Sequence, residues 1–320
     1  MSNSIPKTVY HYCDMNAFYS IIRSSSLRMS NISKSNDYEE ISYCFEAFNK
    51  ALMNACHDYA SEYIQDEETI EFFEHINYDL LVSRAVRNNS LIYYAVCFSS
   101  EYDRLSQWCE YANDGKGVAI GFDTIHMLNA KEYTHIKFDR INYNVLSDEY
   151  YLYNHIKEKL VQIKNGNSKK TNYSEYENAI NGFVSGMVYN AVFYKNPAFK
   201  EEKEWRLVYY PFGRIRNLVS PDLVKEPYEN QIFYDRMKED FEYEKNYYGL
   251  KRGKIEFKNK ENMLISYIDL NFDKIKKSLI KEIIIGPKSK ADDRDLRLFL
   301  LSNGYNLDNI TIRKSSASYR

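Results

Sequence analysis

Three segments of the sequence concentrate side chains that could do chemistry. The first, Tyr10-His11-Tyr12, sets an imidazole between two aromatic rings. The second, from Ser99 to Phe122, contains a tryptophan and a tyrosine three residues apart. The third, from Phe199 to Tyr210, places a glutamate two residues before an arginine in an apolar run. Together they offer an imidazole, aromatic faces and a carboxylate, which are groups that can bind a ligand when a fold brings them together.

Each of these groups also has a purely structural interpretation. His11, at the end of a strand, can be a ring that is satisfied by its neighbours. Trp108 and Tyr111 lie three apart on a short helix and could reach one cleft, although core packing is favoured for Trp108. Glu204 and Arg206 share one face of a strand because side chains alternate there, and a surface ion pair would use the same spacing.

Familiar catalytic and cofactor-binding motifs are missing. There is no G-x-G-x-x-G, no Walker A loop, no G-x-S-x-G elbow and no H-E-x-x-H helix. With 11 glycines in 320 residues, a glycine-rich phosphate loop has little support. The six histidines are scattered, and acidic residues such as Asp37 and Glu40 form no evident ligand set. We therefore expect no metal, which disfavours a nuclease or another hydrolase.

The composition and charge bound the class of protein. The chain has 31 Tyr and 17 Phe, and an aromatic content of 16% excludes collagen-like and disordered chains. A net charge of −2 argues against an extended DNA-binding surface, which needs clustered cations. Two basic stretches, Lys164 to Lys170 and Arg214 to Arg216, are expected to be solvated loops. Since no long apolar run and no signal peptide occur, we expect a soluble, cytoplasmic protein without membrane contact.

The five cysteines are expected to be buried, reduced thiols. Their number is odd and no pair has C-x-x-C spacing, which disfavours disulfides and structural zinc. Cys56-His57 could ligate a metal or form a nucleophilic pair, but adjacent helical residues point about 100° apart. The cysteines are Cys13, Cys44, Cys56, Cys97 and Cys109.

Hydrophobic periodicity predicts the elements that must position these groups. The chain opens with a strand over 8–12, a helix after the N-cap Asp14, and a strand over 27–29. A long helical stretch is predicted over 38–88. It is followed by a buried strand over 91–98, a short helix over 105–112 and a strand over 117–122. The turn signal Asn113-Asp114-Gly115 leads into that last strand.

The second half of the chain alternates in the same way. Predicted strands lie at 135–143, 204–210, 253–258, 263–269, 282–285 and 310–313. Predicted helices lie near 148–164, 175–194 and 291–303, with a loop over 165–172, and the tyrosine-rich region 225–250 is expected to be helical. Short strands interrupted by helical insertions, without a regular βαβ period, predict the α+β class.

The chain resembles a large bacterial family of uncharacterised domains. The marks that carry this resemblance are His11-Tyr12 before a helix, Asn36-Asp37 with Glu40, Trp108 to Phe122, Phe199 to Arg206, and family-like segments at Ile283 to Lys288 and Ser318 to Arg320. They span nearly the whole chain, and their combination is specific. That family implies no function, so an activity must come from a second resemblance.

The order of elements and polar residues is also similar to the ADP-ribosyltransferase fold. In that superfamily, a strand, helix and strand with a histidine at the first strand end precede aromatic residues and a glutamate that opens a late strand. The resemblance implies a single domain over 1–320, an ADP-ribosyltransferase-like split β-sandwich with large helical insertions at about 38–88 and 148–195. That superfamily binds its cofactor without a glycine-rich loop, which fits the low glycine content.

The resemblance to ADP-ribosyltransferases implies roles for individual residues. His11 would hydrogen-bond a ribose of NAD, and Tyr111 or Tyr12 would stack on the nicotinamide. Glu204 would be the catalytic glutamate. Cleaving the nicotinamide bond makes an oxocarbenium-like ribose, and a positioned carboxylate stabilises that charge.

Two other motifs of the superfamily have weaker counterparts here. Ser99, with Ser100, represents at best the serine motif of arginine-specific relatives, a cofactor-binding position. The run Glu202-Lys203-Glu204 has the spacing of the E-x-E pair of many bacterial toxins, but Glu201 extends it to E-E-K-E. The branch that uses histidine, an aromatic residue and one glutamate therefore fits better.

These features predict an NAD-dependent ADP-ribosyltransferase, with NAD as a substrate and no metal. We expect a toxin or phage-defence effector that modifies a macromolecule and is neutralised by an antitoxin protein. Single-stranded RNA is the first acceptor to consider, because exposed aromatic rings can stack on bases while a basic loop holds phosphate. A protein acceptor is the alternative. The second function class is a non-catalytic interaction or sensing module on the same scaffold.

Overall fold

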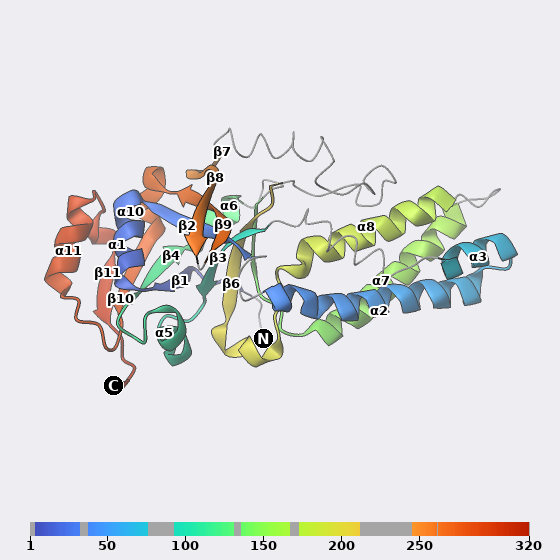
Figure 1. The fold of residues 1–320 in the computed structure, drawn as a ribbon, viewed down its shortest axis with the longest axis horizontal. Helices are drawn as coiled ribbons and strands as arrows, with labels where there is room; N and C mark the ends of the chain where they lie inside the picture. The colour runs from blue at the N-terminus through green and yellow to red at the C-terminus, as the bar shows by residue number, and fades with distance from the viewer. Residues whose placement is uncertain are drawn as a thin grey trace.

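The computed structural model describes residues 4–32, 38–75, 93–130, 136–166, 173–211, 245–260 and 262–319. These residues form a large mixed β-sheet covered by helices, with a helical arm extending from one side of the sheet (Figure 1). The predicted α+β class is confirmed. The described ranges omit Asn36-Asp37, the basic stretch Arg214 to Arg216, most of the loop predicted over 165–172, and Arg320.

The opening strand, helix and strand form where the sequence predicts them. These elements are β1 (Thr8–Cys13), α1 (Met15–Ser24) and β2 (Ser26–Asn31). The Asp14 carboxylate caps α1 by accepting a 2.7 Å hydrogen bond from the amide of Ala17. Phe18, Ile21 and Ile22 form the buried face of the helix. Ser25 ends the helix in the left-handed conformation and turns the chain into β2.

The sheet contains eleven strands among the described residues, and β6 branches from its main path. Along that path the order is β11-β10-β4-β1-β3-β2-β9-β8-β7, while β6 pairs with β3 and β5. Among the strands that the structure describes, only β10 and β11 pair in parallel. The other strands are β3 (Tyr94–Ser99), β4 (Val118–Asp123), β5 (Ile136–Arg140), β6 (Glu204–Tyr209), β7 (Lys245–Tyr247), β8 (Leu250–Lys260), β9 (Met263–Asn271), β10 (Ile280–Ile285) and β11 (Thr311–Lys314).

The ladder between β1 and β3 is the shortest in the sheet. It contains a single register pair, Tyr10 opposite Ser99. β1 instead pairs along its whole length with β4, and β3 pairs along its whole length with β6. β1 and β3 therefore part beside His11, and the sheet is open at the point where the first predicted chemical group lies.

Two hydrophobic cores lie on opposite faces of β3 and β6. Because side chains alternate along a strand, Val96 and Leu207 join the core beneath α1, whereas Ala95 and Val208 join the core of the helical arm. All six side chains of β6 are buried. β6 is paired on both edges, with β3 and β5, and covered on both faces, so its polar residues are also enclosed.

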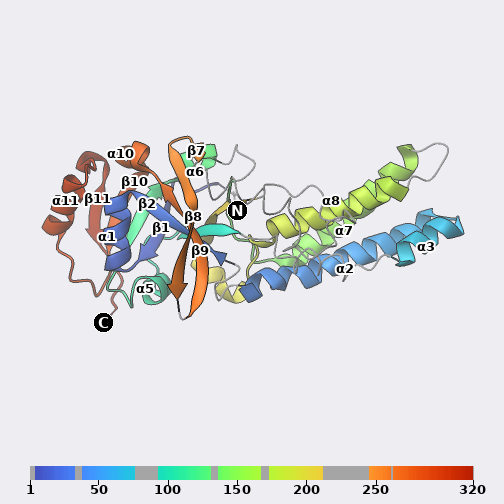
Figure 2. The same ribbon diagram turned by 45° about the horizontal axis from the view of Figure 1, so that its top comes forward.

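The helical arm is formed by the two predicted insertions. It consists of α2 (Tyr38–Tyr63), α3 (Glu67–His75), α7 (Val145–Gly166) and α8 (Tyr173–Ala191). Figures 1 and 2 show these helices running side by side away from the sheet. The helix predicted over 38–88 is thus interrupted between α2 and α3, and the rest of that prediction, from residue 76 to 88, lies outside the described residues.

Shorter elements complete the body around the sheet. They are α5 (Leu105–Tyr111), α6 (Thr124–Ala130), η2 (Pro197–Glu202), η5 (Asp273–Ile275), α10 (Lys276–Leu279), α11 (Asp293–Ser302) and η6 (Leu307–Asn309). The sequence pattern predicts α5 and α11 but not α6 or α10. In the region 225–250, residues 245–247 form a strand and not the predicted helix, while residues 225–244 lie outside the described ranges.

The segment after β11 returns to the N-terminal end of α5. Asp103 accepts hydrogen bonds from the indole nitrogen of Trp108 at 2.7 Å and from the Ser315 hydroxyl. Its second carboxylate oxygen accepts 2.7 Å bonds from the amide and the hydroxyl of Ser316. Further along, Tyr319 donates to Asp114 in the turn that follows α5. One short helix is thus fixed by residues more than two hundred positions away.

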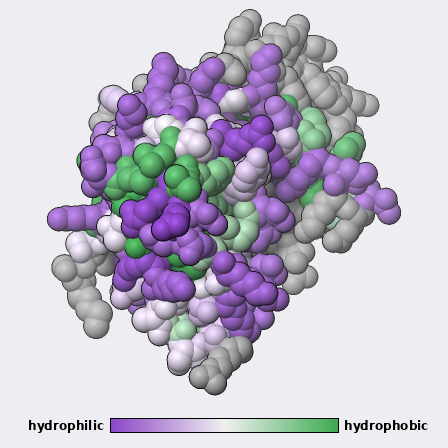
Figure 3. Space-filling model, turned by 90° about the vertical axis from the view of Figure 1, so that its left-hand side faces the viewer, coloured by the Kyte–Doolittle hydropathy of each residue, from purple (hydrophilic) through white to green (hydrophobic). Residues whose placement is uncertain are grey.

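Apolar side chains are exposed at the end of the molecule formed by α11. Figure 3 shows hydrophobic residues there, interspersed with hydrophilic ones. Leu298 and Leu301 of α11 are both more than half exposed, and Phe299 stacks on Tyr19 of α1.

The cysteines are free thiols, but they are not all buried as predicted. Cys13, Cys44 and Cys56 are buried, Cys97 is half-buried, and Cys109 is exposed. Cys109 is next to Trp108 on α5, and only Trp108 turns inward. The prediction fails for Cys109 because a seven-residue helix on the surface buries one side only.

Candidate functional site

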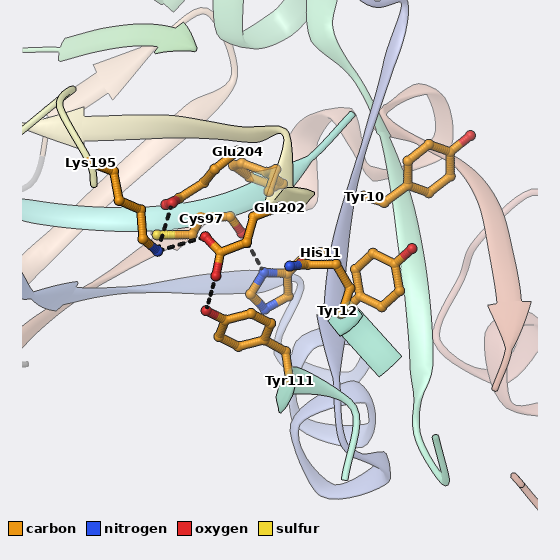
Figure 4. A pocket seen from close by; sticks show the side chains of 10 residues that line it. Tyr10, His11, Tyr12, Cys97, Tyr111, Lys195, Glu202 and Glu204 are labelled. Carbon is orange, nitrogen blue, oxygen red and sulfur yellow. Dashed lines mark hydrogen bonds and ion pairs between the residues drawn. The ribbon is translucent and has the colours of Figure 1, made fainter. Parts of the chain in front are cut away.

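A small cavity lies where β1 and β3 part. Its volume is about 100 Å³. Residues from five separate segments line it: Tyr10, His11, Tyr12, Cys97, Phe98, Gln107, Tyr111, Lys195, Glu202 and Glu204. Figure 4 shows that His11, Tyr111, Lys195 and the two glutamates approach one another from different elements. Four of the five predicted site residues, His11, Tyr12, Tyr111 and Glu204, therefore meet at one place.

The imidazole of His11 is held in one orientation by the backbone of β3. Its Nδ1 lies 2.9 Å from the carbonyl oxygen of Cys97 (Figure 4). A carbonyl oxygen can only accept, so Nδ1 carries the hydrogen. Burial lowers the pKa of His11, although the bond to Cys97 opposes this effect. The ring is therefore neutral near pH 7, and its Nε2 is an acceptor.

The ammonium group of Lys195 lies between the two glutamates. Its Nζ donates to Glu202 at 2.6 Å and to Glu204 at 3.3 Å. The lysine is 2% exposed and its ammonium also lies 4.6 Å from the ring centre of Phe199. A lysine this deeply buried requires charged partners, and the two carboxylates supply them.

A left-handed residue makes the two glutamates converge. Glu202 ends the 3₁₀ helix η2, and Lys203 has a φ of 49°, which reverses the chain direction before Glu204 opens β6. Asn196 caps η2 by accepting from the amide of Ala198. The E-x-E spacing is thus realised as a turn that directs both carboxylates toward Lys195.

Glu204 is fixed by cations on both of its oxygens. Arg206 donates from Nε to Oε1 at 2.6 Å and from Nη2 to Oε2 at 3.2 Å, while Lys195 also approaches Oε2. Glu204 is 6% exposed and Arg206 is 1% exposed, so the surface interpretation of this pair is wrong. Burial alone would raise the pKa of Glu204, but the charges of Arg206 and Lys195 hold it at about 2. Glu204 is a permanent carboxylate at neutral pH.

Glu202 experiences a different balance of effects. Its Oε1 accepts a 3.0 Å bond from the Tyr111 hydroxyl, and its Oε2 accepts from Lys195. Burial and the charge of Glu204 raise the pKa of Glu202, against the opposing effects of Lys195 and Tyr111. Burial and the adjacent carboxylates in turn raise the pKa of the Tyr111 hydroxyl, which stays protonated as the donor.

The remaining predicted residues have supporting positions. Tyr12 donates to the Glu101 carbonyl at 2.8 Å and accepts from the Arg104 amide at 3.1 Å. Its ring packs edge-on against Trp108, which is fully buried as predicted. Ser99 does not line the cavity; its hydroxyl donates to the Glu202 carbonyl at 2.7 Å and helps to fix the glutamate turn.

The sequence interpretation missed several residues of this site. Lys195 and Cys97 belong to no recognisable motif. Gln107 is a polar residue on a short helix, and its type alone does not mark it as a site residue. Gln107 and Tyr111 stand four apart, which places both on the cavity side of α5, whereas Trp108 turns into the core. The four-residue spacing was the available signal, and it selects Gln107 as the partner of Tyr111.

A second, larger cavity of about 510 Å³ is less suited to chemistry. It lies between the end of α1 and the strands β8 and β9, and side chains of both charge signs line it. Among these, Asp269 pairs with Arg28 and Asp273 with Lys276. Its residues are Arg23, Ser24, Ser25, Lys251, Gly253, Lys254, Glu256, Asp269, Asn271, Asp273 and Lys276. Partly exposed ion pairs of this kind contribute only about 0–1 kcal/mol, whereas the charged groups of the smaller cavity are buried, so the smaller cavity is the better candidate.

Comparison with known proteins gives one match. Residues 107–207 match a family described as a protein of unknown function, DUF2971. This supports the resemblance to an uncharacterised family over that segment. The matched segment carries five of the ten cavity residues, namely Gln107, Tyr111, Lys195, Glu202 and Glu204. No curated protein and no solved structure matches the chain.

Two features of the described residues bear on membranes and metals. None of their helices combines the length and apolarity needed to cross a bilayer. Within the same ranges, no group of three or more histidine, cysteine or acidic side chains is arranged to hold a metal ion.

Proposed function

We propose that the protein is an NAD-dependent ADP-ribosyltransferase. The observation that supports this most directly is that His11, Tyr111 and Glu204, which come from three distant segments, line one cavity. The resemblance to ADP-ribosyltransferases implies the same residues from the sequence alone. Their meeting at the opening between β1 and β3 is what a binding site for the nicotinamide and its ribose requires.

The size of the cavity limits what can lie inside it. Sites that enclose a whole drug-sized ligand have volumes of about 300–1,000 Å³, and this cavity has about 100 Å³. It can hold one ring but not a dinucleotide. In the proposed complex the nicotinamide occupies the cavity, and the rest of NAD extends outward past Tyr111, a residue that is 43% exposed.

The charges at the cavity suit the proposed reaction. When the bond from the ribose to nicotinamide breaks, positive charge develops on the ribose, and a fixed carboxylate can stabilise it. Glu204 is ionised and enclosed, with its position set by Arg206. The neutral His11 offers Nε2 as an acceptor for a ribose hydroxyl. The raised pKa of Glu202 suits a residue that exchanges a proton with the acceptor or the leaving group.

The acceptor in this proposal is a macromolecule, with single-stranded RNA first and protein as the alternative. The protein would act as a toxin or phage-defence effector in the cytoplasm and be restrained by an antitoxin. Exposed tyrosines on the helical arm, such as Tyr150 and Tyr151 of α7, could stack on bases. No metal takes part in this scheme.

A second candidate function is a non-catalytic binding or sensing module. One specific observation favours it: each of the four carboxylate oxygens of Glu202 and Glu204 already has a partner in the protein. A cluster that is satisfied internally can exist for stability alone. NAD binding without any transfer would support the module.

The deciding experiment is expression in a bacterium, followed by mass analysis of nucleic acid and protein for added ADP-ribose. Purified protein with labelled NAD gives the matched assay in vitro. Glu204→Gln should abolish transfer, and Glu201→Gln, which changes an exposed glutamate in the same run, should retain it. Full transfer by folded Glu204→Gln would overturn the assignment of Glu204.

A further inference from the structure

Gln107 is the one cavity residue with a buried polar atom that has no partner among the described residues. The residue is 6% exposed, and its side-chain nitrogen is buried without a hydrogen bond. The other polar groups around the cavity, on His11, Tyr12 and Tyr111, all donate within the protein. Gln107 therefore differs from its neighbours in having an unused donor.

An unused donor in this place is costly for the free protein. A buried polar group without a partner destabilises a fold by about 1–3 kcal/mol, and a methionine or leucine would fill the same volume without that cost. The fold does not need a polar group at position 107, because the start of α5 is held by Asp103. A ligand that accepts a hydrogen bond from the side-chain nitrogen of Gln107 would explain why a glutamine stands at this position.

We propose that Gln107 is the specificity-determining residue that binds the primary carboxamide of a ring seated in the cavity. This inference rests on the proposed function, in which that ring is nicotinamide. A glutamine side chain and a carboxamide can form two complementary bonds, because each offers an N–H donor and a carbonyl acceptor. A cavity of about 100 Å³ has room for a single ring with such a group.

Three residues around the ring would then each recognise a different part of the ligand. Gln107 binds the carboxamide, Tyr111, four residues further on the same helix, offers its ring face, and His11 faces the ribose side with its Nε2 acceptor. Nicotinic acid has a carboxylate in place of the carboxamide. It can accept from the Gln107 nitrogen but cannot donate to the Gln107 carbonyl, so it forms one bond where nicotinamide forms two. The site should therefore prefer nicotinamide to nicotinic acid.

The test uses the full chain and two probes, nicotinamide and NAD. Gln107→Met should leave the melting temperature of the ligand-free protein unchanged or raise it, because it removes an unsatisfied amide. The same variant should weaken binding of nicotinamide by about tenfold or more in calorimetry. Gln107→Glu should weaken the binding of nicotinamide too. It should disfavour nicotinic acid further, because the carboxylates of the variant and of the ligand repel each other. Ser106→Ala, on the exposed side of α5, is the control and should change neither quantity.

The outcomes separate this inference from the proposed function. If wild-type protein binds NAD and transfers ADP-ribose while Gln107→Met binds nicotinamide as tightly as wild type, the role of Gln107 is wrong and the function stands. A clear fall in the melting temperature of ligand-free Gln107→Met would also overturn it, since the residue would then be structural. If intact wild-type protein binds neither probe at millimolar concentration, the proposed function and this inference both fail.

Discussion

Glu202 and Glu204 share the ammonium group of Lys195, yet their pKa values move in opposite directions. Lys195 Nζ lies 2.6 Å from Glu202 and 3.3 Å from Glu204. Glu204 has Arg206 as a second cation and its pKa falls to about 2, whereas the pKa of Glu202 is raised by burial and by the neighbouring carboxylate. When two carboxylates differ in this way, one can supply a fixed negative charge while the other carries a proton.

The first prediction concerns the stability that Glu204 provides. Glu204→Gln leaves Arg206 and Lys195 buried with one carboxylate fewer. Breaking a buried ion pair on one side costs about 3–5 kcal/mol, and we expect a loss of that size in the free energy of unfolding. Urea denaturation measures it. Glu201→Gln is the matched control, since its exposed pair with Arg104 should contribute about 0–1 kcal/mol. Equal losses in the two variants would contradict the buried pairing of Glu204 with Arg206 and Lys195.

The second prediction concerns the pH dependence of that stability. The pKa of Glu204 is lowered from 4.5 to about 2 on folding, so the unfolded chain binds a proton first as the pH falls. The contribution of Glu204 to the free energy of unfolding is fully present above pH 4.5 and is lost progressively toward pH 2. The difference in unfolding free energy between wild type and Glu204→Gln should therefore be constant above about pH 5 and shrink below it. A difference that persists unchanged at pH 3 would contradict the ionised, paired carboxylate.

The third prediction concerns His11. Its pKa is lowered from the ordinary value of 6.5 because the ring is buried. Below pH 6.5 the unfolded chain takes up a proton that the folded ring resists, so stability should fall as the pH decreases from 7 to 5. His11→Gln keeps a donor for the Cys97 carbonyl and should reduce this slope. His57→Gln, at an exposed site, should leave it unchanged. A residual slope from His126 is expected, because its pKa is also lowered.

The fourth prediction separates two tyrosines that the sequence treats alike. Tyr12→Phe leaves the Arg104 amide and the Glu101 carbonyl without their partner, so we expect a loss of about 1–3 kcal/mol in stability. Tyr111→Phe loses a bond to Glu202, which still has Lys195, and its ring is partly exposed. Its effect on stability should be smaller, and its effect on NAD binding larger. Thermal unfolding and calorimetry measure the two quantities, and the reverse order would assign the ligand contact to Tyr12.

Much of the fold was predictable because its signals are local. The cap at Asp14, the turn at Gly115 and the alternation of buried residues in β3 and β6 each depend on neighbours in the sequence. The opening between β1 and β3 was not predictable in this way. It depends on which strands pair, and β6 reaches β3 from more than a hundred residues away.

The candidate site was predictable only in part for the same reason. His11, Tyr111 and Glu204 have types and positions that a resemblance could select. No feature of the sequence marks Lys195, because a single lysine before a turn is usually solvated. Its burial results from two glutamates that the left-handed Lys203 turns toward it. The burial of Arg206 likewise follows from the pairing of β6 with β3 and β5 on its two edges.

The bonds from Asp103 to Ser315 and Ser316 bear on the order in which the cavity can form during synthesis. The helix that presents Gln107 and Tyr111 leaves the ribosome early, but the residues that fix its start are made about two hundred positions later. A nascent chain that has reached Arg206 contains every residue lining the cavity and still lacks the groups that hold this wall in place. The wall of the cavity formed by α5 therefore gains these bonds only after Ser315 and Ser316 have been synthesised.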